Sequence, residues 1–210
     1  MESIKTNLLT FAFSVIAIAA IECAAFLLKL QAQSPALLYI ALVRLIEIGV
    51  LLVILRRSSG SLGLVSLSET GIKRILWRSL GWSAVCCFAI IALYWLMKAL
   101  DPVIWQQLSP KQRSRVSPGL LFITGGLLSP IAEELFFRRI IFGFFRRWGF
   151  YLSTLISTSL FILPHLSSAT LPLLPLMGGI ILALVYEKEK YLLAPILVHI
   201  TANTLWLIFL

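Results

Sequence analysis

The chain has 210 residues, of which 60% are hydrophobic and only 13% are charged, and its mean hydropathy is +0.97. Soluble domains carry roughly a quarter charged residues, so this composition excludes disorder, a secreted disulfide scaffold and an ordinary cytosolic enzyme. The formal net charge of +9 is distributed between apolar runs. This pattern favours anchoring in a membrane over binding to nucleic acid.

Apolar runs long enough to cross a bilayer recur along the chain. The first, near 8–28, follows one lysine and has no signal-peptide cleavage pattern, so we expect a retained span. Further spans are expected near 35–55, 77–97, 118–137, 150–170, 171–186 and 191–210. Pro172 and Pro175 interrupt the pair at 150–186, so one member could be re-entrant. The sequence predicts an all-α integral membrane protein of about seven transmembrane helices, in one domain over 1–210.

Lysine and arginine are concentrated in alternate connections between these spans. One side would carry Lys5, Arg56, Arg57, Lys73, Arg74, Arg78, Arg138, Arg139, Arg146, Arg147, Lys188 and Lys190. The other would carry only Lys29, Lys98, Lys111, Arg113 and Arg115. Because positively charged loops remain in the cytoplasm, we expect the N-terminus inside and the C-terminus outside.

Ionisable side chains inside apolar spans are costly, and they indicate function by default. The C-terminal half places Glu133, Glu134, Arg138 and both histidines of the chain, His165 and His199, in such spans. Glu134 and Arg138 are four residues apart, with the acid first, which favours an ion pair on a helix. Glu133 points about 100° away from that pair. We therefore expect a structural Glu134–Arg138 pair and a free, reactive Glu133.

The other polar residues in spans have simpler interpretations. Arg44 and Glu47 are three residues apart on one helix, so we expect them to pair, and Glu22 could join their network. All three cysteines of the chain lie in apolar runs, where we expect them to pack without redox chemistry.

Helical geometry predicts that the polar residues of the C-terminal half meet. Glu133 and His165 lie equally far from Gly149, so an antiparallel hairpin would place both at about 24 Å from the turn. His199 and Asn203 share one face of the last span. Prolines accompany these groups, and each frees backbone groups that need water or a partner: Pro130, Pro164 and Pro195. We therefore expect a wet cavity in the C-terminal half.

These side chains could activate a water molecule in two ways. Glu133, His165 and His199 could bind a zinc ion with an open position, and the metal would acidify the water. Without a metal, Glu133 would be the general base, the histidines would orient the water, and His199 with Asn203 would stabilise the oxyanion. The residues leave both mechanisms open.

Other intramembrane chemistries lack their residues. The one aspartate, Asp101, excludes both an aspartyl protease and an aspartate-rich magnesium site. No His-Glu-x-x-His motif occurs.

Three motifs stand in a fixed order on three apolar segments. They are Glu133-Glu134-Leu135-Phe136-Phe137-Arg138 (EExxxR), Phe161-Ile162-Leu163-Pro164-His165 (FxxxH) and His199-Ile200-Thr201-Ala202-Asn203 (HxxxN). In this order they resemble the CPBP family of intramembrane proteases, also called the CAAX-protease or Abi family. The resemblance covers a CPBP-like catalytic core at 116–210, whereas the N-terminal spans at 1–115 share only their hydrophobicity with the family.

The resemblance implies a membrane endopeptidase whose site opens toward the cytoplasm. It assigns catalysis to Glu133, His165, His199 and Asn203, support to Glu134 and Arg138, and packing at the site to Phe161. The family is described both as zinc metallopeptidases and as metal-free, glutamate-dependent proteases, so the cofactor stays open. The expected partners are membrane lipid and a membrane-associated, lipidated or leader-peptide protein, with no nucleic acid. The short chain is typical of bacterial members, so we expect the bacterial cytoplasmic membrane.

The alternative is a non-catalytic membrane protein. It could be an immunity or scaffold protein that keeps the motifs, or a small transporter that uses the polar cavity. Proteolysis should vanish on Glu133→Gln, whereas a scaffold should tolerate that change and a transporter should show substrate flux.

Overall fold

The computed structural model describes residues 5–29, 36–59, 69–100, 117–166 and 173–209. Within these ranges every regular element is helical, which confirms the predicted fold class. The N-terminal helices are α1 (Leu8–Lys29), α2 (Ala36–Ser59) and α3 (Glu69–Leu100). After a continuous helical stretch from Pro118 to Trp148 come α8 (Phe150–Ile162), η5 (Leu163–His165), α9 (Leu173–Glu189) and α10 (Leu193–Phe209).

The stretch from Pro118 to Trp148 changes its winding several times. Its parts are α5 (Pro118–Leu121), η2 (Phe122–Leu128), α6 (Ser129–Glu133), η3 (Glu134–Phe142), α7 (Gly143–Phe145) and η4 (Arg146–Trp148). Ser117 caps its start, because the side chain accepts a hydrogen bond from the Leu120 N–H. The wider π-helical turns are η2 and η3. Pro130 has no N–H and so cannot donate a backbone hydrogen bond within the helix. It lies in the first turn of α6, and η2 ends directly before α6.

The length and composition of the helices identify an integral membrane protein. In the described ranges, four stretches are long and apolar enough to cross a bilayer: Leu8–Leu28, Leu37–Ser58, Gly71–Ala92 and Pro118–Trp148. Two apolar helices are shorter, Phe150–His165 and Leu193–Ile208. Large apolar side chains such as Phe88 and Tyr151 point outward, as expected where lipid is the solvent.

The two members expected at 150–186 are separate helices in the described residues, α8 and α9, and a re-entrant member stays a prediction. α8 and α9 pack against each other. With 13 residues, α8 is about 20 Å long, less than the bilayer core of about 30 Å. It ends at the 3-10 turn that contains Pro164, which accounts for its early end.

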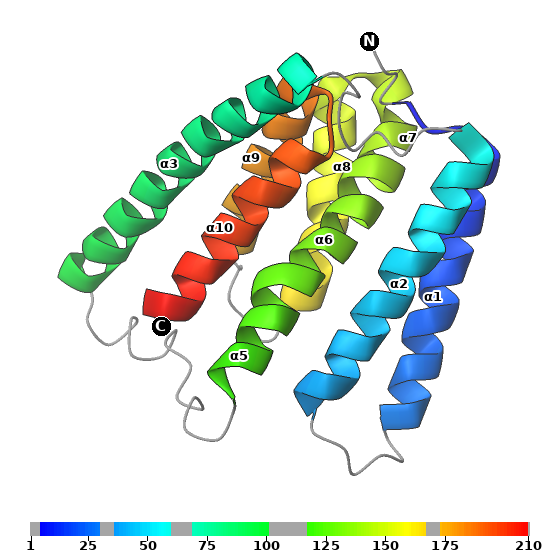
Figure 1. Cartoon of the computed structure of the whole chain (residues 1–210), viewed down its shortest axis with the longest axis horizontal. Coiled ribbons are helices and arrows are strands. Elements are labelled where there is room, and N and C mark those ends of the chain that lie inside the picture. The colour runs from blue at the N-terminus through cyan, green and yellow to red at the C-terminus, as the bar shows by residue number, and fades with distance from the viewer. Residues whose placement is uncertain (1–4, 30–35, 60–68, 101–116, 167–172, 210) are drawn as a thin grey trace.

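Figure 1 shows how the helices are arranged. α1 and α2 lie side by side at one edge, and α3 lies at the other. Between them run α10 and the Pro118–Trp148 stretch, with α8 and α9 behind. A buried apolar core joins α2, η3, α9 and α10, and it includes Leu51, Leu135, Phe142, Tyr186 and Ile196. The two halves of the chain therefore form one packed bundle.

The start of α1 and the end of α10 lie at opposite ends of the bundle (Figure 1). The end that holds the start of α1 also holds the α7–α8 corner and the α9–α10 turn. At the corner, Gly149 has a φ of 112°, which side chains with a Cβ rarely adopt, and this confirms the predicted break between helices. Opposite ends for the two termini agree with the predicted topology, while the direction across the membrane stays a prediction.

The segment before α1 is bound to the end of the Pro118–Trp148 stretch. The Thr6 N–H donates to the Gly143 carbonyl at 3.0 Å, and its hydroxyl donates to the Arg139 carbonyl at 2.7 Å. Arg147 Nη2 donates to the Thr6 carbonyl at 2.8 Å. These contacts fix the start of the first span to the helix that carries Glu133 and Glu134.

Candidate active site

A buried ion pair lies at the centre of the candidate site. Arg138 Nε lies 3.1 Å from Glu134 Oε2, and neither side chain is exposed. The interaction between Glu134 and Arg138 is electrostatic, because Arg138 Nε and Glu134 Oε2 do not have the alignment of a hydrogen bond. Arg138 Nη1 donates to the Ser157 hydroxyl of α8 at 3.2 Å, and that hydroxyl donates to the Phe137 carbonyl at 2.9 Å. The predicted Glu134–Arg138 pair is confirmed, and it joins η3 to α8.

His199 on α10 lies between the two neighbouring glutamates. Its Nδ1 is 2.9 Å from Glu134 Oε1, and its Nε2 is 3.6 Å from Glu133 Oε2. An ionised carboxylate only accepts hydrogen bonds, so the contact with Glu134 places a proton on Nδ1. Nε2 is thereby directed toward Glu133. Glu134 thus fixes the orientation of His199 as well as pairing with Arg138, a link that the sequence did not predict.

The two glutamates have different surroundings. Glu133 keeps 20% of its side chain exposed, whereas the Glu134 side chain is completely buried. The gap of 3.6 Å between Glu133 and His199 is longer than a direct hydrogen bond, and polar groups at such a distance can be bridged by water. Glu133 is therefore the more exposed of the two carboxylates, while the predicted division of their roles stays a prediction.

Phe161 packs at the centre of these groups. Its ring lies 5.9 Å from the His199 ring and 5.3 Å from the His165 ring. The Arg138 guanidinium lies 5.2 Å from the centre of the same ring. A cation over an aromatic face is stabilised, most strongly where water is excluded. Phe161 thus separates the two histidines and contacts the buried arginine, the packing position that the motif implies.

His165 lies at the end of α8 with an exposed side chain. Its Nδ1 is 3.1 Å from the Phe161 carbonyl, and since a carbonyl only accepts, this nitrogen carries the proton of that bond. His165 has a hydrogen bond and a ring contact with Phe161, and no hydrogen bond or ion pair joins it to Glu133 or His199 in the described part of the chain. The similar depth of Glu133 and His165 that we predicted does not bring their side chains together.

Asn203 lies one turn after His199 on α10. Its Nδ2 donates to the Gly125 carbonyl of η2 at 3.0 Å. α10 and η2 approach closely there, because a Cβ on Gly126 would lie 3.5 Å from the Thr204 hydroxyl. An amide nitrogen carries two hydrogens, so Asn203 keeps a second donor while bound to Gly125.

The three expected zinc ligands do not form one cluster in the described part of the chain. No group of three His, Cys, Asp or Glu side chains there is close enough to hold a metal ion. Glu133 and His199 would offer two donors, and the Nδ1 of His199 is already bound to Glu134. As arranged, these side chains do not fit a three-ligand zinc site.

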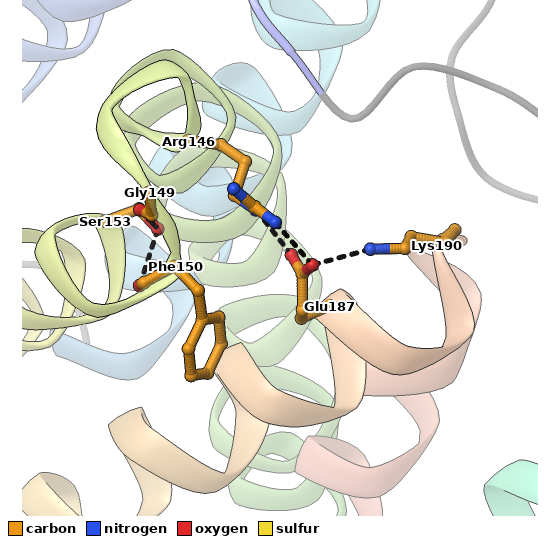
Figure 2. A network of polar contacts seen from close by, with 6 residues as sticks. All are labelled: Arg146, Gly149, Phe150, Ser153, Glu187 and Lys190. Carbon is orange, nitrogen blue, oxygen red and sulfur yellow. Dashed lines mark hydrogen bonds and ion pairs between the residues drawn. The ribbon is translucent and has the colours of Figure 1, made fainter.

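A polar network fixes the turn that leads into α10 (Figure 2). Arg146 Nε and Nη2 donate to Glu187 at 2.7 and 2.8 Å, and Lys190 Nζ donates to the same carboxylate at 2.7 Å. Burial raises the pKa of Glu187, but the hydrogen bonds from Arg146 and Lys190 outweigh it and lower the pKa overall. This network holds the α7–α8 corner against the turn and so helps to place α10 with His199.

Sequence reasoning missed two polar partners of the site. Ser157 binds Arg138, and the Gly125 carbonyl binds Asn203. The serines and threonines of α8 were a weak signal, since buried hydroxyls in an apolar helix need partners. The role of a backbone carbonyl in a π-helix has no signal in residue identity.

Comparisons with known proteins point to one family. Residues 115–205 match the family described as type II CAAX prenyl endopeptidase Rce1-like. The "Putative membrane peptidase YdiL" of Bacillus subtilis (strain 168) is 35% identical over 86 residues, which are 40% of this chain and 35% of that protein. The "Membrane-embedded CAAX protease MroQ" of Staphylococcus aureus (strain USA300) is 29% identical over 147 residues, 64% of this chain and 58% of that protein.

An "Uncharacterized 24.3 kDa protein" of Escherichia coli is 34% identical over 95 residues, 43% of this chain and 44% of that protein. The chain thus spans less than two thirds of the length of each of these relatives. No solved structure matches it significantly.

Proposed function

We propose that the chain is a CPBP-family protein, because its segment 115–205 matches the Rce1-like family model, and that it is an intramembrane endopeptidase. It hydrolyses a peptide bond of a membrane-associated or lipidated protein or peptide. The observation that carries this proposal is the placement of His199 between a partly exposed Glu133 and a buried Glu134.

Glu133 acts as the general base in this proposal. A water molecule between Glu133 and His199 gives a proton to the carboxylate, and its oxygen attacks the carbonyl carbon of the substrate. The resulting tetrahedral intermediate collapses with cleavage of the C–N bond, and the proton held by Glu133 passes to the leaving amine. The exposed side of Glu133 supports this assignment, since Glu134 is enclosed and bound to Arg138.

His199 and Asn203 have supporting roles in this scheme. Glu134 fixes the imidazole through Nδ1, so that Nε2 faces the water. The second hydrogen of the Asn203 amide stabilises the negative charge that develops on the carbonyl oxygen. Removing one such donor in other enzymes costs about 10²–10³ in kcat. His165 lines the approach beside Phe161, where its exposed ring can contact the substrate.

We propose a mechanism without a metal because the donors do not converge. A zinc site built from Glu133, His165 and His199 would require His165 to turn toward the other two. If zinc were bound there, it would supply acidified water. The activity of the purified protein after exhaustive chelation tests this part of the proposal.

The membrane orientation in this proposal rests on the distribution of lysine and arginine between the connections of the spans. The N-terminus lies inside, in the bacterial cytoplasmic membrane, and the site is reached from the cytoplasmic side. The names of the matched family and of the Staphylococcus relative, both CAAX proteases, support a substrate that is bound to the membrane. A lipidated C-terminus or a leader peptide held at the surface has this property.

The experiment that tests the proposal compares protein termini in membranes from cells that express the wild type or Glu133→Gln. Glu189→Gln is a matched control, since it removes a carboxylate at the end of α9 whose hydrogen-bond partners, Arg78 and Trp82, belong to α3 and not to the site. New termini should appear with the wild type and with the control, and be absent with Glu133→Gln at equal expression. Identical termini in all three would refute proteolysis and favour an immunity or scaffold protein.

A further inference from the structure

An ionic cluster connects the first two helices inside the membrane. Arg44 Nη1 on α2 donates to Glu22 on α1 at 3.1 Å and to Glu47, one turn further along α2. The pairing predicted from the sequence is therefore confirmed. Glu47 is 3% exposed at its side chain, whereas Arg44 is 25% exposed.

This cluster does not satisfy its own polar atoms. Arg44 Nε and Glu47 Oε1 are buried and have no hydrogen-bond partner in the described part of the chain. A charged group in an apolar span is costly unless it is paired or has a function. Two carboxylates that share one guanidinium leave the cluster incompletely paired, so a purely structural role accounts poorly for it.

The helix that carries Arg44 and Glu47 packs against the helix that carries the candidate base. α2 packs against η2, α6 and η3, and the Thr124 hydroxyl of η2 donates to the Leu37 carbonyl of α2 at 3.5 Å. Arg44 lies within electrostatic reach of Glu133, the last residue of α6. Arg138 also interacts electrostatically with Glu133, but it is completely buried against Glu134.

We propose that Arg44 is a positioning residue of the active site. Glu22 and Glu47 orient its guanidinium, which places a positive charge beside Glu133 and restrains that carboxylate for reaction with water. This inference rests on the proposed function and extends it. It adds to the site a residue from the N-terminal half, outside the segment 115–205 that matches the family.

A simpler role for Arg44 would be to neutralise Glu47 in lipid. The two roles predict different behaviour when both charges are removed together. If Arg44 only neutralises Glu47, the double variant Arg44→Gln/Glu47→Gln regains both folding and activity. If Arg44 restrains Glu133, the double variant regains folding but stays slow, because the charge beside Glu133 is still missing.

The test measures kcat and KM of purified, reconstituted variants on a peptide that spans a cut found in the comparison of protein termini, together with their thermal unfolding. The variants are Arg44→Gln, Arg44→Lys and Arg44→Gln/Glu47→Gln. Arg57→Gln is the matched control, since Arg57 is an exposed arginine near the end of the same helix. We expect about a tenfold loss of kcat in Arg44→Gln and in the double variant, with KM unchanged. Arg44→Lys should regain part of kcat.

Each outcome decides between the two roles. Wild-type kcat in a folded double variant would overturn the proposal and leave Arg44 as a counter-ion of Glu47. If Arg44→Gln does not fold, the kcat values of the double variant and of Arg44→Lys are compared with the wild-type kcat instead. Cleavage of the peptide by the wild type and by Arg57→Gln supports the proposed function independently of the result for the Arg44 variants. Absence of cleavage by the wild type refutes the proposed function, and the role of Arg44 in catalysis with it.

Discussion

Replacement of Arg138 by methionine should destabilise the protein strongly, because it leaves a buried carboxylate without its counter-ion. Both side chains of the Glu134–Arg138 pair are completely buried, and their charges lie 3.1 Å apart. Removing one partner of a buried pair costs about 3–5 kcal/mol. For a chain of this size, a loss of that order corresponds to a fall in Tm of roughly 6–20 °C.

The double variant Arg138→Met/Glu134→Gln separates stability from activity. It removes both charges, so Tm should return close to the wild-type value, as is often found when a buried pair is replaced by neutral groups. Activity should stay low, because the substituted amide would hold His199 through a neutral acceptor and no longer through a carboxylate.

The assay is thermal unfolding in detergent, followed by peptide cleavage, with Arg57→Met as the exposed control. A wild-type Tm in the single variant would refute the reasoning, since it would mean that the buried charge of Glu134 needs no partner. Wild-type cleavage by the folded double variant would refute the role of Glu134 in orienting His199.

Three further predictions concern backbone, pH and metal. Gly149→Ala should lower the free energy of unfolding by about 1–3 kcal/mol, because φ is 112° there; unchanged chemical denaturation would contradict this. The lowered pKa of Glu187 makes the Arg146–Glu187–Lys190 network stabilising above pH about 4.5, and this stability is lost as pH falls through the folded-state pKa. The Tm difference between wild type and Glu187→Gln should therefore shrink below pH 4.5, and a constant difference would contradict it. Exhaustive chelation should leave kcat unchanged, whereas a loss that zinc restores would establish a metal site.

Spacing along one helix was sufficient to predict contacts within that helix. Glu134 with Arg138 and Arg44 with Glu47 follow from neighbours on one helix face, and both pairs are present. The helical character of the described segments followed in the same way from their apolar runs. These features depend on the local geometry of a helix, which residue order fixes.

Contacts between helices needed the structure. The bond between His199 and Glu134 depends on how α10 rotates against η3, and no spacing rule specifies that rotation. The equal spacing of Glu133 and His165 from Gly149 predicted a similar depth of the two residues along the helices, but not the direction of their side chains. The 3-10 turn at Pro164 and the π-helical winding of η3 both change where side chains point. The packing of α2 against α6, on which the proposed role of Arg44 depends, likewise has no signal in residue spacing.

The most direct test of the central claim is the rate of peptide hydrolysis by purified, reconstituted wild type and Glu133→Gln. General-base catalysis contributes about 10²–10⁴ in rate, so Glu133→Gln should lower kcat by at least about a hundredfold while Tm and membrane insertion are kept. A folded Glu133→Gln protein that cleaves within a few-fold of the wild-type rate would contradict the assignment of Glu133 as the base.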